Sequence, residues 1–529
     1  MKKAAFHNLG CKVNSYELDI MRQILRDQGF EEVPFQDKAD IYVVNTCTVT
    51  NIADRKSRQM LHRAKKTNPD AVVVAVGCYV ETEPAGVEKD DAIDLVIGNN
   101  RKTRIGEVLT AFLKEKDLGA GKAPAEQEET QGAAGGENLS GGKELTSEKK
   151  LSPGKPVLRE DLNCAPAYED MQLTQPGHTR AYIKIQDGCN QFCSYCIIPY
   201  ARGRIRSRAK EEVLREVAGL VRGGIREIVL TGIHISSYGL DRDAEVPVRF
   251  DPVKAGRALL DLFTDLNAME GLERIRLGSL EPRIMTESFI AGIAGLKKIC
   301  PHFHLSLQSG CDETLRRMNR HYTTAEYARS VDLLRRYYDR PAITTDVIVG
   351  FPGETEEEFE KTCAFLEKIR FYEIHVFRYS RRNGTVAARM KDQIPESVKA
   401  RRSDRLLALT AAQAEAYRMQ FAGGPETLLL EEICEHEGRS YWTGSTTRYV
   451  TGAVPADRPL TGKTGETPVE GQEPLPGKAQ EKDTLTQGML LEGTFGKETI
   501  RFSKGDALVF RAPVIALRCR SGERHVRKE

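Results

Sequence analysis

Three cysteines lie close together in the central part of the sequence, at Cys189, Cys193 and Cys196. Thiolates at this spacing can hold three irons of a four-iron, four-sulfur cluster and leave the fourth iron without a protein ligand. An open coordination position is where a metal site can bind and activate a substrate. An electron-transfer ferredoxin would supply a fourth cysteine, and a zinc knuckle would need a fourth Cys or His nearby; none follows Cys196 closely. The spacing therefore predicts a catalytic cluster.

A second set of cysteines, Cys11, Cys47 and Cys78, is spread over the first eighty residues. Each one follows a Gly or a Thr at the end of an apolar run, in the strings LGC, NTC and VGC. The carboxyl ends of parallel strands meet at one edge of an open sheet, where ligands bind. We expect the three thiols to converge there on a second metal site. The alternative is three ordinary buried cysteines, which are common in proteins.

The elements that must position this second set alternate between strands and helices. Residues 4–10, 40–46, 71–77 and 93–98 are apolar runs typical of buried strands, and residues 15–29 and 54–66 have a helical pattern. This alternation predicts an α/β fold with a doubly wound parallel sheet over residues 1–114.

The central block, residues 179–420, repeats the same alternation six times. We expect its strands at residues 181–186, 227–232, 274–279, 303–308, 343–351 and 374–380. Six strand–helix units predict a partial (β/α)6 barrel whose site lies at the C-terminal ends of the strands. The run that contains Cys189 directly follows the first of these strands, which places it at that edge.

Polar residues stand at the ends of the other central strands, where they could contact a charged cofactor that carries a ribose and an amino acid end. Any one of them alone is more simply a turn or cap residue, but their recurrence on one edge favours a binding site. The predicted cofactor-binding residues are Thr231, Gly232, Ser279, Glu281, Gln308 and Asp346.

The remaining parts of the 529-residue chain are a C-terminal block and two segments of low apolar content. Residues 421–529 contain short apolar runs that predict a small β-barrel, with a disordered insertion at 455–487. Residues 115–178 read as a disordered linker. The start of the sequence has no signal-peptide pattern, and no apolar run is long enough to span a bilayer. We therefore expect a cytoplasmic protein whose cysteines bind metal or catalyse.

Basic residues gather near the predicted cluster, although the formal net charge of the chain is only +2. Arg202, Arg204, Arg206, Arg208 and Lys210 recur every second residue, a spacing that would place them on one face of an extended segment. A second group is Arg378, Arg381 and Arg382, and the C-terminus is basic as well. For the first two groups we expect contact with an RNA backbone, and for the C-terminal group an ordinary solvated surface.

Together these residues resemble the methylthiotransferase family of radical S-adenosylmethionine (SAM) enzymes. The resemblance covers residues 1–114 and 179–420, and more loosely the end of the chain. It rests on GCKVN, NTCTVT and GCYVE around the first cysteine set, on the spaced central cysteines, and on RLGSLEP, LSLQSGCDETLRRMNR and DVIVGFPGETEEEF. The longer linker and the interrupted C-terminal block depart from the family pattern.

The resemblance implies two [4Fe–4S] clusters and SAM as cofactors. Cys189, Cys193 and Cys196 would hold the cluster that cleaves SAM to a 5′-deoxyadenosyl radical, which makes them the expected catalytic ligands. Cys11, Cys47 and Cys78 would hold an auxiliary cluster that carries the sulfur. The C-terminal barrel would resemble the TRAM-like RNA-binding barrel of these enzymes.

Three substrate branches are known in the family, and this sequence most resembles the branch that methylthiolates C2 of N6-threonylcarbamoyladenosine beside the tRNA anticodon. GCKVNSYE, NTCTVTNIADRKSRQ and IKIQDGCNQFCSYCIIPYARG carry that resemblance. Isopentenyladenosine of tRNA, an aspartate of a ribosomal protein, and a non-catalytic iron–sulfur carrier are the alternatives. The implied partners are a tRNA anticodon stem-loop and a flavodoxin- or ferredoxin-type electron donor, with no membrane, and a monomer is the simplest expectation.

Overall fold

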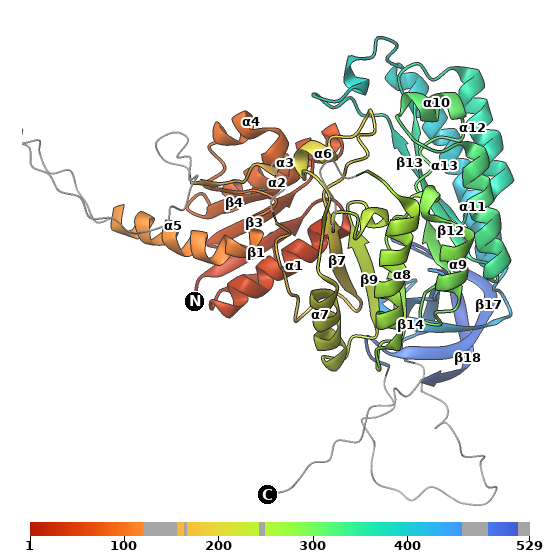
Figure 1. Ribbon diagram of the computed structural model, residues 1–529. Coiled ribbons are helices and arrows are strands. Elements are labelled where there is room, and N and C mark those ends of the chain that lie inside the picture. The colour runs from red at the N-terminus through yellow and green to blue at the C-terminus, as the bar shows by residue number, and fades with distance from the viewer. Residues whose placement is uncertain (120–155, 163–166, 243–248, 458–484, 517–529) are drawn as a thin grey trace, which may run out of the picture. The chain divides into compact units, whose positions relative to one another are not determined.

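The computed structural model describes residues 1–119, 156–162, 167–242, 249–457 and 485–516 (Figure 1). It divides into two compact units. The first contains Met1–Gln172 together with Ile197–Arg204, and the second contains Leu173–Cys196 together with Ile205–Glu529. The short piece that follows Cys196 therefore belongs to the N-terminal unit, although the sequence assigned it to the central domain. None of the helices in the described ranges is both long enough and apolar enough to cross a membrane.

The first unit is built on a six-stranded parallel sheet with the order β2-β1-β3-β4-β5-β6. The strands are β1 (Lys3–Asn8), β2 (Glu31–Val33), β3 (Ile41–Thr46), β4 (Val72–Gly77), β5 (Leu95–Ile97) and β6 (Val157–Leu158). The predicted doubly wound sheet is confirmed. The short edge strand β2 is additional, and it pairs through only three residues with β1. Its weak apolar pattern, EEV, explains why the sequence did not reveal it.

Helices cover both faces of this sheet. The first unit contains α1 (Lys12–Asp27), α2 (Asn51–Thr67), α3 (Cys78–Thr82), α4 (Pro84–Glu88), α5 (Ile105–Gly119) and α6 (Ile198–Ala201). One apolar core joins the sheet to Leu18 of α1 and Leu109 of α5, and a second core joins it to Leu61 of α2. Two separate cores on one sheet are the result of alternate side chains pointing to opposite faces.

Six parallel strands of the second unit form an open half-barrel. They are β7 (Ala181–Asp187), β9 (Glu227–Gly232), β10 (Arg274–Leu277), β11 (His302–His304), β12 (Ala342–Val349) and β13 (Glu373–Arg378), with the short antiparallel β8 (Arg206–Ser207) beside β7. Hydrogen bonds of Leu280 with His304 and Ser306 join the β10 side to the β11 side. The six predicted parallel strands are therefore present, in two sheets with the orders β10-β9-β7-β8 and β11-β12-β13.

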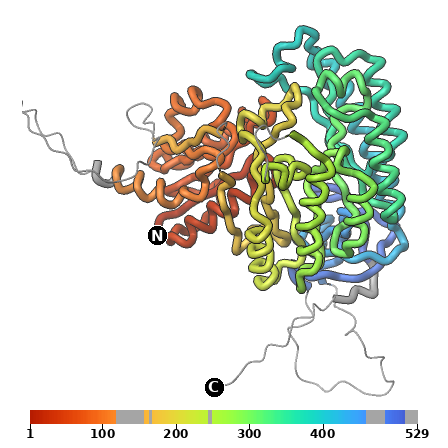
Figure 2. Tube along the Cα trace, in the orientation of Figure 1, coloured from red at the N-terminus to blue at the C-terminus, as the bar shows by residue number. Residues whose placement is uncertain are grey.

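The outer helices of the half-barrel follow these strands in turn. They are α7 (Lys210–Arg222), α8 (Pro252–Ala268), α9 (Glu287–Ala294), α10 (Asp312–Arg317), α11 (Thr324–Tyr337), α12 (Glu356–Ile369) and α13 (Glu396–Met419). The tube in Figure 2 follows this succession from yellow through green to cyan within the second unit. Helices α11 and α12 each begin with a capping box, at Thr323 with Glu326 and at Thr355 with Glu358.

The C-terminal block is a closed five-stranded barrel with the order β14-β15-β16-β18-β17. Its strands are β14 (Pro425–His436), β15 (Arg439–Ser445), β16 (Thr451–Pro455), β17 (Leu490–Phe502) and β18 (Gly505–Ala516). Its core is shared with the half-barrel, because Tyr372, Tyr417 and Phe421 pack among its inward-facing leucines. The two barrels therefore form one packed body.

The described ends of the predicted linker are ordered. The helix α5 continues to Gly119, Val157 and Leu158 extend the parallel sheet, and Met171 and Leu173 are buried. These few apolar residues were hidden in a polar stretch, so composition alone did not single them out. Residues 120–155 of that linker, and nearly all of the predicted insertion at 455–487, lie outside the described residues.

Candidate functional site

The first cysteine set lies at the carboxyl ends of three strands that are neighbours in the sheet. Cys11 precedes α1 after β1, Cys47 follows β3, and Cys78 begins α3 directly after β4. The order β1-β3-β4 places Cys11 and Cys47 on the two sides of the position where the strand order reverses, which is the usual ligand crevice of this fold. The three residues follow the first, third and fourth strands, because the edge strand β2 intervenes in the sequence.

The three thiols are close enough to influence one another's ionisation. Burial, and then the nearby Cys78 and Cys11, raises the pKa of Cys47 to about 12. Desolvation by the surrounding protein is also the main cause of the raised pKa of Cys11, although its side chain is open to the surface; its neighbours include Cys78 and the guanidinium of Arg202. Thiols that hinder one another's ionisation in this way favour a shared cation that would neutralise them.

Two glycines let the backbone approach the cysteines closely. A Cβ atom on Gly10 would lie 3.0 Å from Cys47 Sγ, and Gly10 has a positive φ of 107°. Gly77 has a φ of 100°, and a Cβ atom there would lie 2.5 Å from Asn45 Oδ1 and 2.8 Å from the carbonyl of Thr46. Only glycine fits these positions without strain.

A buried arginine connects the cysteine set to helix α1. Arg202 donates hydrogen bonds from Nη1 to Glu17 Oε1 (2.8 Å), from Nη2 to Asn14 Oδ1 (2.7 Å) and from Nε to Cys78 Sγ (3.3 Å). Its side chain is fully buried, and Lys102 pairs with the same carboxylate. The prediction that Arg202 faces an RNA backbone was therefore wrong, because its guanidinium is used inside the N-terminal unit.

Asn99 is a second donor to the same sulfur. Its Nδ2 lies 3.6 Å from Cys78 Sγ and 2.7 Å from the carbonyl of Ala201. N–H groups directed at sulfur stabilise a thiolate and tune the potential of a cluster that the thiolate holds. The donor set around Cys78 fits an iron–sulfur cluster better than it fits three neutral thiols.

The central cysteines lie in a loop after β7 that the half-barrel holds at several points. Ser194 receives a hydrogen bond at its carbonyl from Ala387 N–H (2.8 Å), donates its own N–H to Met318 (3.0 Å), and bonds Arg317 through its hydroxyl (2.8 Å). Tyr195 packs against the cluster of Met318, Phe351, Tyr379 and Ala387. These contacts fix the loop between its cysteines.

The sulfurs of this loop also receive N–H donors. Gln191 N–H lies 3.4 Å from Cys189 Sγ, and Arg320 Nη1 lies 3.2 Å from Cys193 Sγ. Burial, followed by the proximity of Cys193 and Cys196, raises the pKa of Cys189. The central cysteines therefore share two features with the first set: three mutually close thiols, and a cationic N–H donor to one of the sulfurs.

A buried carboxylate stands near Cys189. Glu281, in the segment that follows β10, accepts hydrogen bonds from His234 Nε2 (2.7 Å) and from Arg283. Burial alone would raise the pKa of Glu281, but the hydrogen bond and the charge of His234 hold it well below its usual range. An ionised carboxylate at this position can hold the amino group of a ligand.

A third cluster of polar side chains lies on β11, β12 and β13. Asp346, predicted as a cofactor contact, is flanked by His304 Nε2 at 3.3 Å and His375 Nδ1 at 3.1 Å. Hydrogen bonds to Asp346 and Glu373 raise the pKa of His375 to about 10. The sequence revealed Asp346 through its strand but gave no sign of the two histidines, because the pairing of β11, β12 and β13 brings them together.

The other predicted contacts have mixed surroundings. Thr231 is buried at the end of β9. The next residue, Gly232, is closely packed, because a Cβ atom there would lie 2.9 Å from the carbonyl of Gln186. Gln308 has a positive φ of 70°, and its N–H bonds the carbonyl of Asp346 at 2.8 Å. Ser279 is exposed. The structure thus connects Gln308 with Asp346 but leaves the role of each of these residues a prediction.

Arg206, Arg208 and Lys210 of the first basic group lie beside acidic residues of the second unit, which corrects the prediction that they form an RNA surface. Arg208 is buried against Glu216, and Lys210 pairs with Asp261 (2.8 Å) and Asp265 (2.9 Å). Arg206 is buried, and its guanidinium lies 3.7 Å from Asp187. The prediction required an extended segment, in which every second side chain points to the same face, but only Arg206–Ser207 is extended here. In the second group Arg382 is buried, and the basic C-terminus lies outside the described residues.

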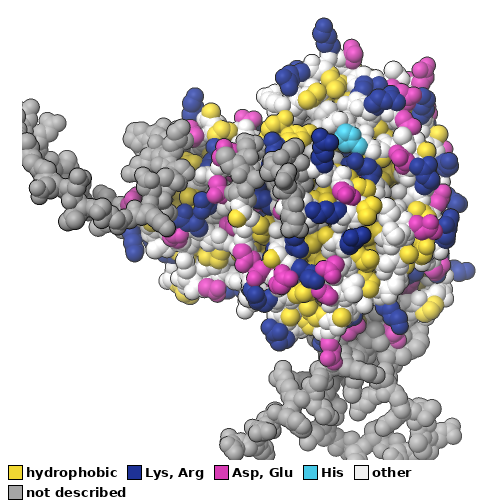
Figure 3. Space-filling model, viewed as in Figure 1, with side chains coloured by type: hydrophobic (Ala, Val, Ile, Leu, Met, Phe, Trp, Pro, Cys, Tyr) yellow, Lys and Arg dark blue, Asp and Glu magenta, His cyan; other side chains and the backbone are white. Residues whose placement is uncertain are grey.

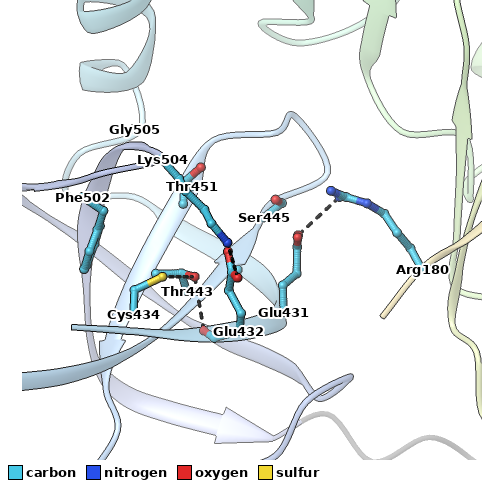
Figure 4. A pocket seen from close by; sticks show the side chains of 11 residues that line it. Arg180, Glu431, Glu432, Cys434, Thr443, Ser445, Thr451, Phe502, Lys504 and Gly505 are labelled. Carbon is cyan, nitrogen blue, oxygen red and sulfur yellow. Dashed lines mark hydrogen bonds and ion pairs between the residues drawn. The ribbon is translucent and has the colours of Figure 1, made fainter. Parts of the chain in front are cut away.

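A hollow of about 320 Å³ opens on the C-terminal barrel (Figure 4). Its charged side chains pair with one another: Arg180 with Glu431 at 3.3 Å, and Lys504 with Glu432 at 2.5 Å. Two cations and two anions leave this hollow without net charge. It therefore gives no support to an RNA contact at this position of the barrel.

Comparison with known proteins agrees with this arrangement. Residues 183–366 match the model of the Radical SAM superfamily, and residues 3–98 match Uncharacterized protein family UPF0004. The Threonylcarbamoyladenosine tRNA methylthiotransferase MtaB of Bacillus subtilis is 39% identical over 464 residues, which cover 88% of this chain and 92% of that protein. The chain belongs to the methylthiotransferase family of radical SAM enzymes.

Further relatives of this methylthiotransferase include proteins with two different names. The MtaB protein of Aquifex aeolicus is 38% identical over 76% of this chain and 86% of its own length. The tRNA-2-methylthio-N(6)-dimethylallyladenosine synthase of Carboxydothermus hydrogenoformans is 34% identical over 76% of this chain and 81% of its own length. A solved radical SAM methyltransferase, TsrM of Kitasatospora setae, aligns with a TM-score of 0.47 at 18% identity, covering 73% of this chain and 74% of that one; this likeness carries no functional argument.

As a radical SAM methylthiotransferase, the protein is an enzyme that uses SAM and [4Fe–4S] clusters. Sequence reasoning missed the side chains that surround the two cysteine sets: Asn14, Glu17, Asn99, Lys102 and Arg202 in the first unit, and His234, Arg283 and Arg320 in the second. The motif GCKVNSYE contains Asn14 and Glu17 one turn apart on α1, so their shared face was a usable signal. The sequence showed Arg202 only as one of a basic series and gave no sign of its partners, since Asn14 and Glu17 lie 188 and 185 residues earlier and Cys78 lies 124 residues earlier.

Proposed function

We propose that this methylthiotransferase adds a methylthio group to C2 of N6-threonylcarbamoyladenosine next to the anticodon of tRNA. The observation that carries the proposal is the pair of cysteine sets, each with mutually close thiols and an arginine N–H donor to sulfur: the buried Arg202 at Cys78 and the half-buried Arg320 at Cys193. Two separately ligated clusters suit two tasks, radical generation and sulfur supply. The MtaB relatives favour the threonylcarbamoyl substrate within the family.

The residues take the following roles in this proposal. Cys189, Cys193 and Cys196 would hold the [4Fe–4S] cluster that supplies the electron for reductive cleavage of SAM. The carboxylate of Glu281 and its partner His234 orient the amino acid end of SAM near Cys189. Cys11, Cys47 and Cys78 hold the auxiliary cluster, and Arg202 and Asn99 fix the orientation of Cys78.

The remaining cofactor contacts are assigned by position. Thr231, Gly232, Ser279, Gln308 and Asp346 lie at or near the carboxyl ends of the half-barrel strands and are assigned to the ribose and adenine of SAM. We further infer that a flavodoxin- or ferredoxin-type protein supplies the electron and that the enzyme acts as a cytoplasmic monomer.

Nucleoside mass spectrometry of tRNA tests the substrate. We expect 2-methylthio-threonylcarbamoyladenosine to be absent from cells that lack this gene and to return when the gene is restored. If 2-methylthio-isopentenyladenosine returns instead, the chemistry stands but the substrate is isopentenyladenosine. The relative from Carboxydothermus hydrogenoformans makes this the main alternative substrate. If neither nucleoside responds, the tRNA substrate is refuted, and a ribosomal-protein aspartate or a carrier role becomes the explanation.

Serine variants separate the two cysteine sets. A variant with serine at Cys189, Cys193 and Cys196 should lose SAM cleavage by the reduced protein. A variant with serine at Cys11, Cys47 and Cys78 should keep SAM cleavage but form no methylthio product. Each variant should retain about half of the iron, because each removes one of two four-iron clusters. Loss of SAM cleavage in the second variant would contradict the division of roles.

A further inference from the structure

Helix α2 of the first unit presents a face of one charge sign. Its buried side chains, Asp54, Ser57, Leu61 and Ala64, form one stripe at helical spacing. The opposite side carries exposed residues that are basic or neutral, and we call them the α2 basic face: Arg55, Lys56, Arg58, Gln59, His62, Arg63 and Lys66. The only acidic residue of the helix, Asp54, is buried.

An ordinary solvated helix face mixes both signs, because opposite charges three or four residues apart stabilise the helix and like charges destabilise it. The surface seen in Figure 3 has that mixed pattern, with basic and acidic side chains side by side. On the exposed side of α2 several pairs at these distances are both basic, as for Arg55 with Arg58 and Arg63 with Lys66. The acidic residue at such a distance is the buried Asp54, four residues before Arg58. A helix that keeps such repulsion favours an anion from outside the chain.

Several of these cations are available to a ligand. In the part of the chain that the structure describes, His62 pairs with Asp90 at 2.9 Å and Arg58 reaches the hydroxyl of Tyr79 at 3.4 Å, but Arg55, Lys56, Arg63 and Lys66 have no acidic partner. The surface is also hollowed there: Arg55, Arg58, Gln59 and His62 line a depression of about 650 Å³. Guanidinium, imidazole and amide donors around one hollow suit phosphate oxygens.

The helix is attached directly to the auxiliary cysteines. Ser57 accepts a hydrogen bond from Cys47 N–H (3.2 Å) and donates one to the carbonyl of Cys47 (3.1 Å). Between the cysteine and the basic face lie Val49 and Ile52, whose exposed fractions are 52% and 59%. Exposed aliphatic side chains beside a row of cations match a ligand that has both an anionic backbone and apolar bases.

We propose that the α2 basic face binds the phosphate backbone of the RNA substrate and so holds the RNA against the cysteines that carry the sulfur. This inference rests on the proposed function and adds the surface that recognises the RNA. From Arg55 to Lys66 the face extends about 16 Å along the helix, at 1.5 Å for each residue. One strand of a nucleic-acid helix carries about five phosphates over that length.

Binding of an anticodon stem-loop RNA to the reconstituted full-length enzyme tests the proposal, with fluorescence anisotropy measured over a range of KCl concentrations. The test variant combines Arg55→Gln, Lys56→Gln, Arg63→Gln and Lys66→Gln. The matched control removes four exposed charges from the second unit. They lie at or beyond the C-terminal ends of the outer helices, on the side away from the catalytic edge. The substitutions are Arg222→Gln, Lys297→Gln, Arg336→Gln and Lys368→Gln. Iron content and thermal midpoint establish that both variants are folded.

We expect the α2 variant to bind the RNA at least about tenfold more weakly at moderate salt and to lose about 2–3 units from the slope of log K against log salt. The control should keep the wild-type slope, since both variants change net charge equally. A wild-type slope in the α2 variant would overturn this inference while leaving the proposed function intact. If the wild-type enzyme itself neither binds the RNA nor forms a methylthio nucleoside, the proposed function fails, which is a different outcome.

Discussion

Arg202 Nε lies 3.3 Å from Cys78 Sγ while the other two nitrogens of the same guanidinium bond Glu17 and Asn14. One planar group thus fixes a cysteine after β4 to the helix after β1. Arginine places its donors on three nitrogens in one rigid plane, whereas the three N–H groups of lysine all leave a single nitrogen. Arg202 is in this sense a positioning residue for the auxiliary cysteines.

We expect Arg202→Lys to keep the fold, because a cation remains beside Glu17, but to weaken the auxiliary cluster. Loss of an N–H donor to sulfur should lower the reduction potential of that cluster and leave the other cluster unchanged. Iron content and an anaerobic redox titration followed by electron paramagnetic resonance measure both effects. Arg204→Lys is the control, and an unchanged potential in Arg202→Lys would refute the role of Nε.

Gly77→Ala should damage the same site through the backbone. Gly77 has a φ of 100°, and the added methyl would meet Asn45 Oδ1 and the carbonyl of Thr46. We expect a loss of about 1–3 kcal/mol in the free energy of unfolding, together with loss of iron, because Cys78 is displaced. Chemical denaturation and iron analysis provide the measurements.

Gly29→Ala is the matched control for this glycine. Gly29 also has a positive φ, of 85°, but a Cβ atom there meets nothing within 4 Å. The Gly29→Ala variant should therefore show only the backbone strain and keep its full iron content. Equal iron loss in the two variants would mean that close packing at Gly77 is not what positions Cys78.

The stability of the half-barrel should depend on pH through His375. Its hydrogen bonds to Asp346 and Glu373 raise its pKa to about 10, above the ordinary value of 6.5. A raised pKa in the folded state contributes stability that is complete below about 6.5 and is lost as the pH rises through about 10. The wild-type protein should therefore lose stability relative to His375→Gln between pH 7 and 10.

This pH dependence is checked by denaturant unfolding of both proteins across that range. The difference should be modest, since the His375 side chain is 48% exposed and water screens its charge. His62→Gln, which removes an exposed histidine from another ion pair, serves as the control. Parallel stability curves for wild type and His375→Gln would contradict the prediction.

Arg276 should be essential for joining the half-barrel to the C-terminal barrel. It is fully buried, pairs with Glu227 at 2.6 Å, and donates to the carbonyls of Thr446 (2.6 Å) and Thr447 (2.9 Å). Arg276→Met leaves Glu227 buried with a weaker set of partners and should cost about 3–5 kcal/mol of stability. Unfolding measured by circular dichroism tests this expectation.

The double variant Glu227→Gln with Arg276→Met should recover part of the loss, because it removes the buried charge as well as its partner. Failure of the double variant to recover any stability would show that the carbonyl contacts of Arg276, rather than its ion pair, dominate. Arg180→Met is a suitable comparison, since Arg180 lies 3.6 Å from the same carboxylate and is more exposed.

The sequence by itself determined the features that depend on local pattern. Apolar runs at the right spacing located the main strands of the N-terminal sheet and of the half-barrel. The position of each cysteine after a strand placed Cys11, Cys47 and Cys78 at one edge of the N-terminal sheet. These predictions succeed because strand direction and the period of side-chain orientation are local properties. The family followed from the same cysteines and their neighbours.

Only the tertiary structure decided which polar residues reach a site. Arg202 and Arg208 looked like members of one exposed basic stripe, but long-range packing buries the first against Glu17 and the second against Glu216. His304 and His375 join Asp346 only because three strands from distant parts of the chain are paired. Charge and spacing are visible in a sequence, whereas burial and partners depend on segments that are far apart in it, and these decide what a charged side chain does.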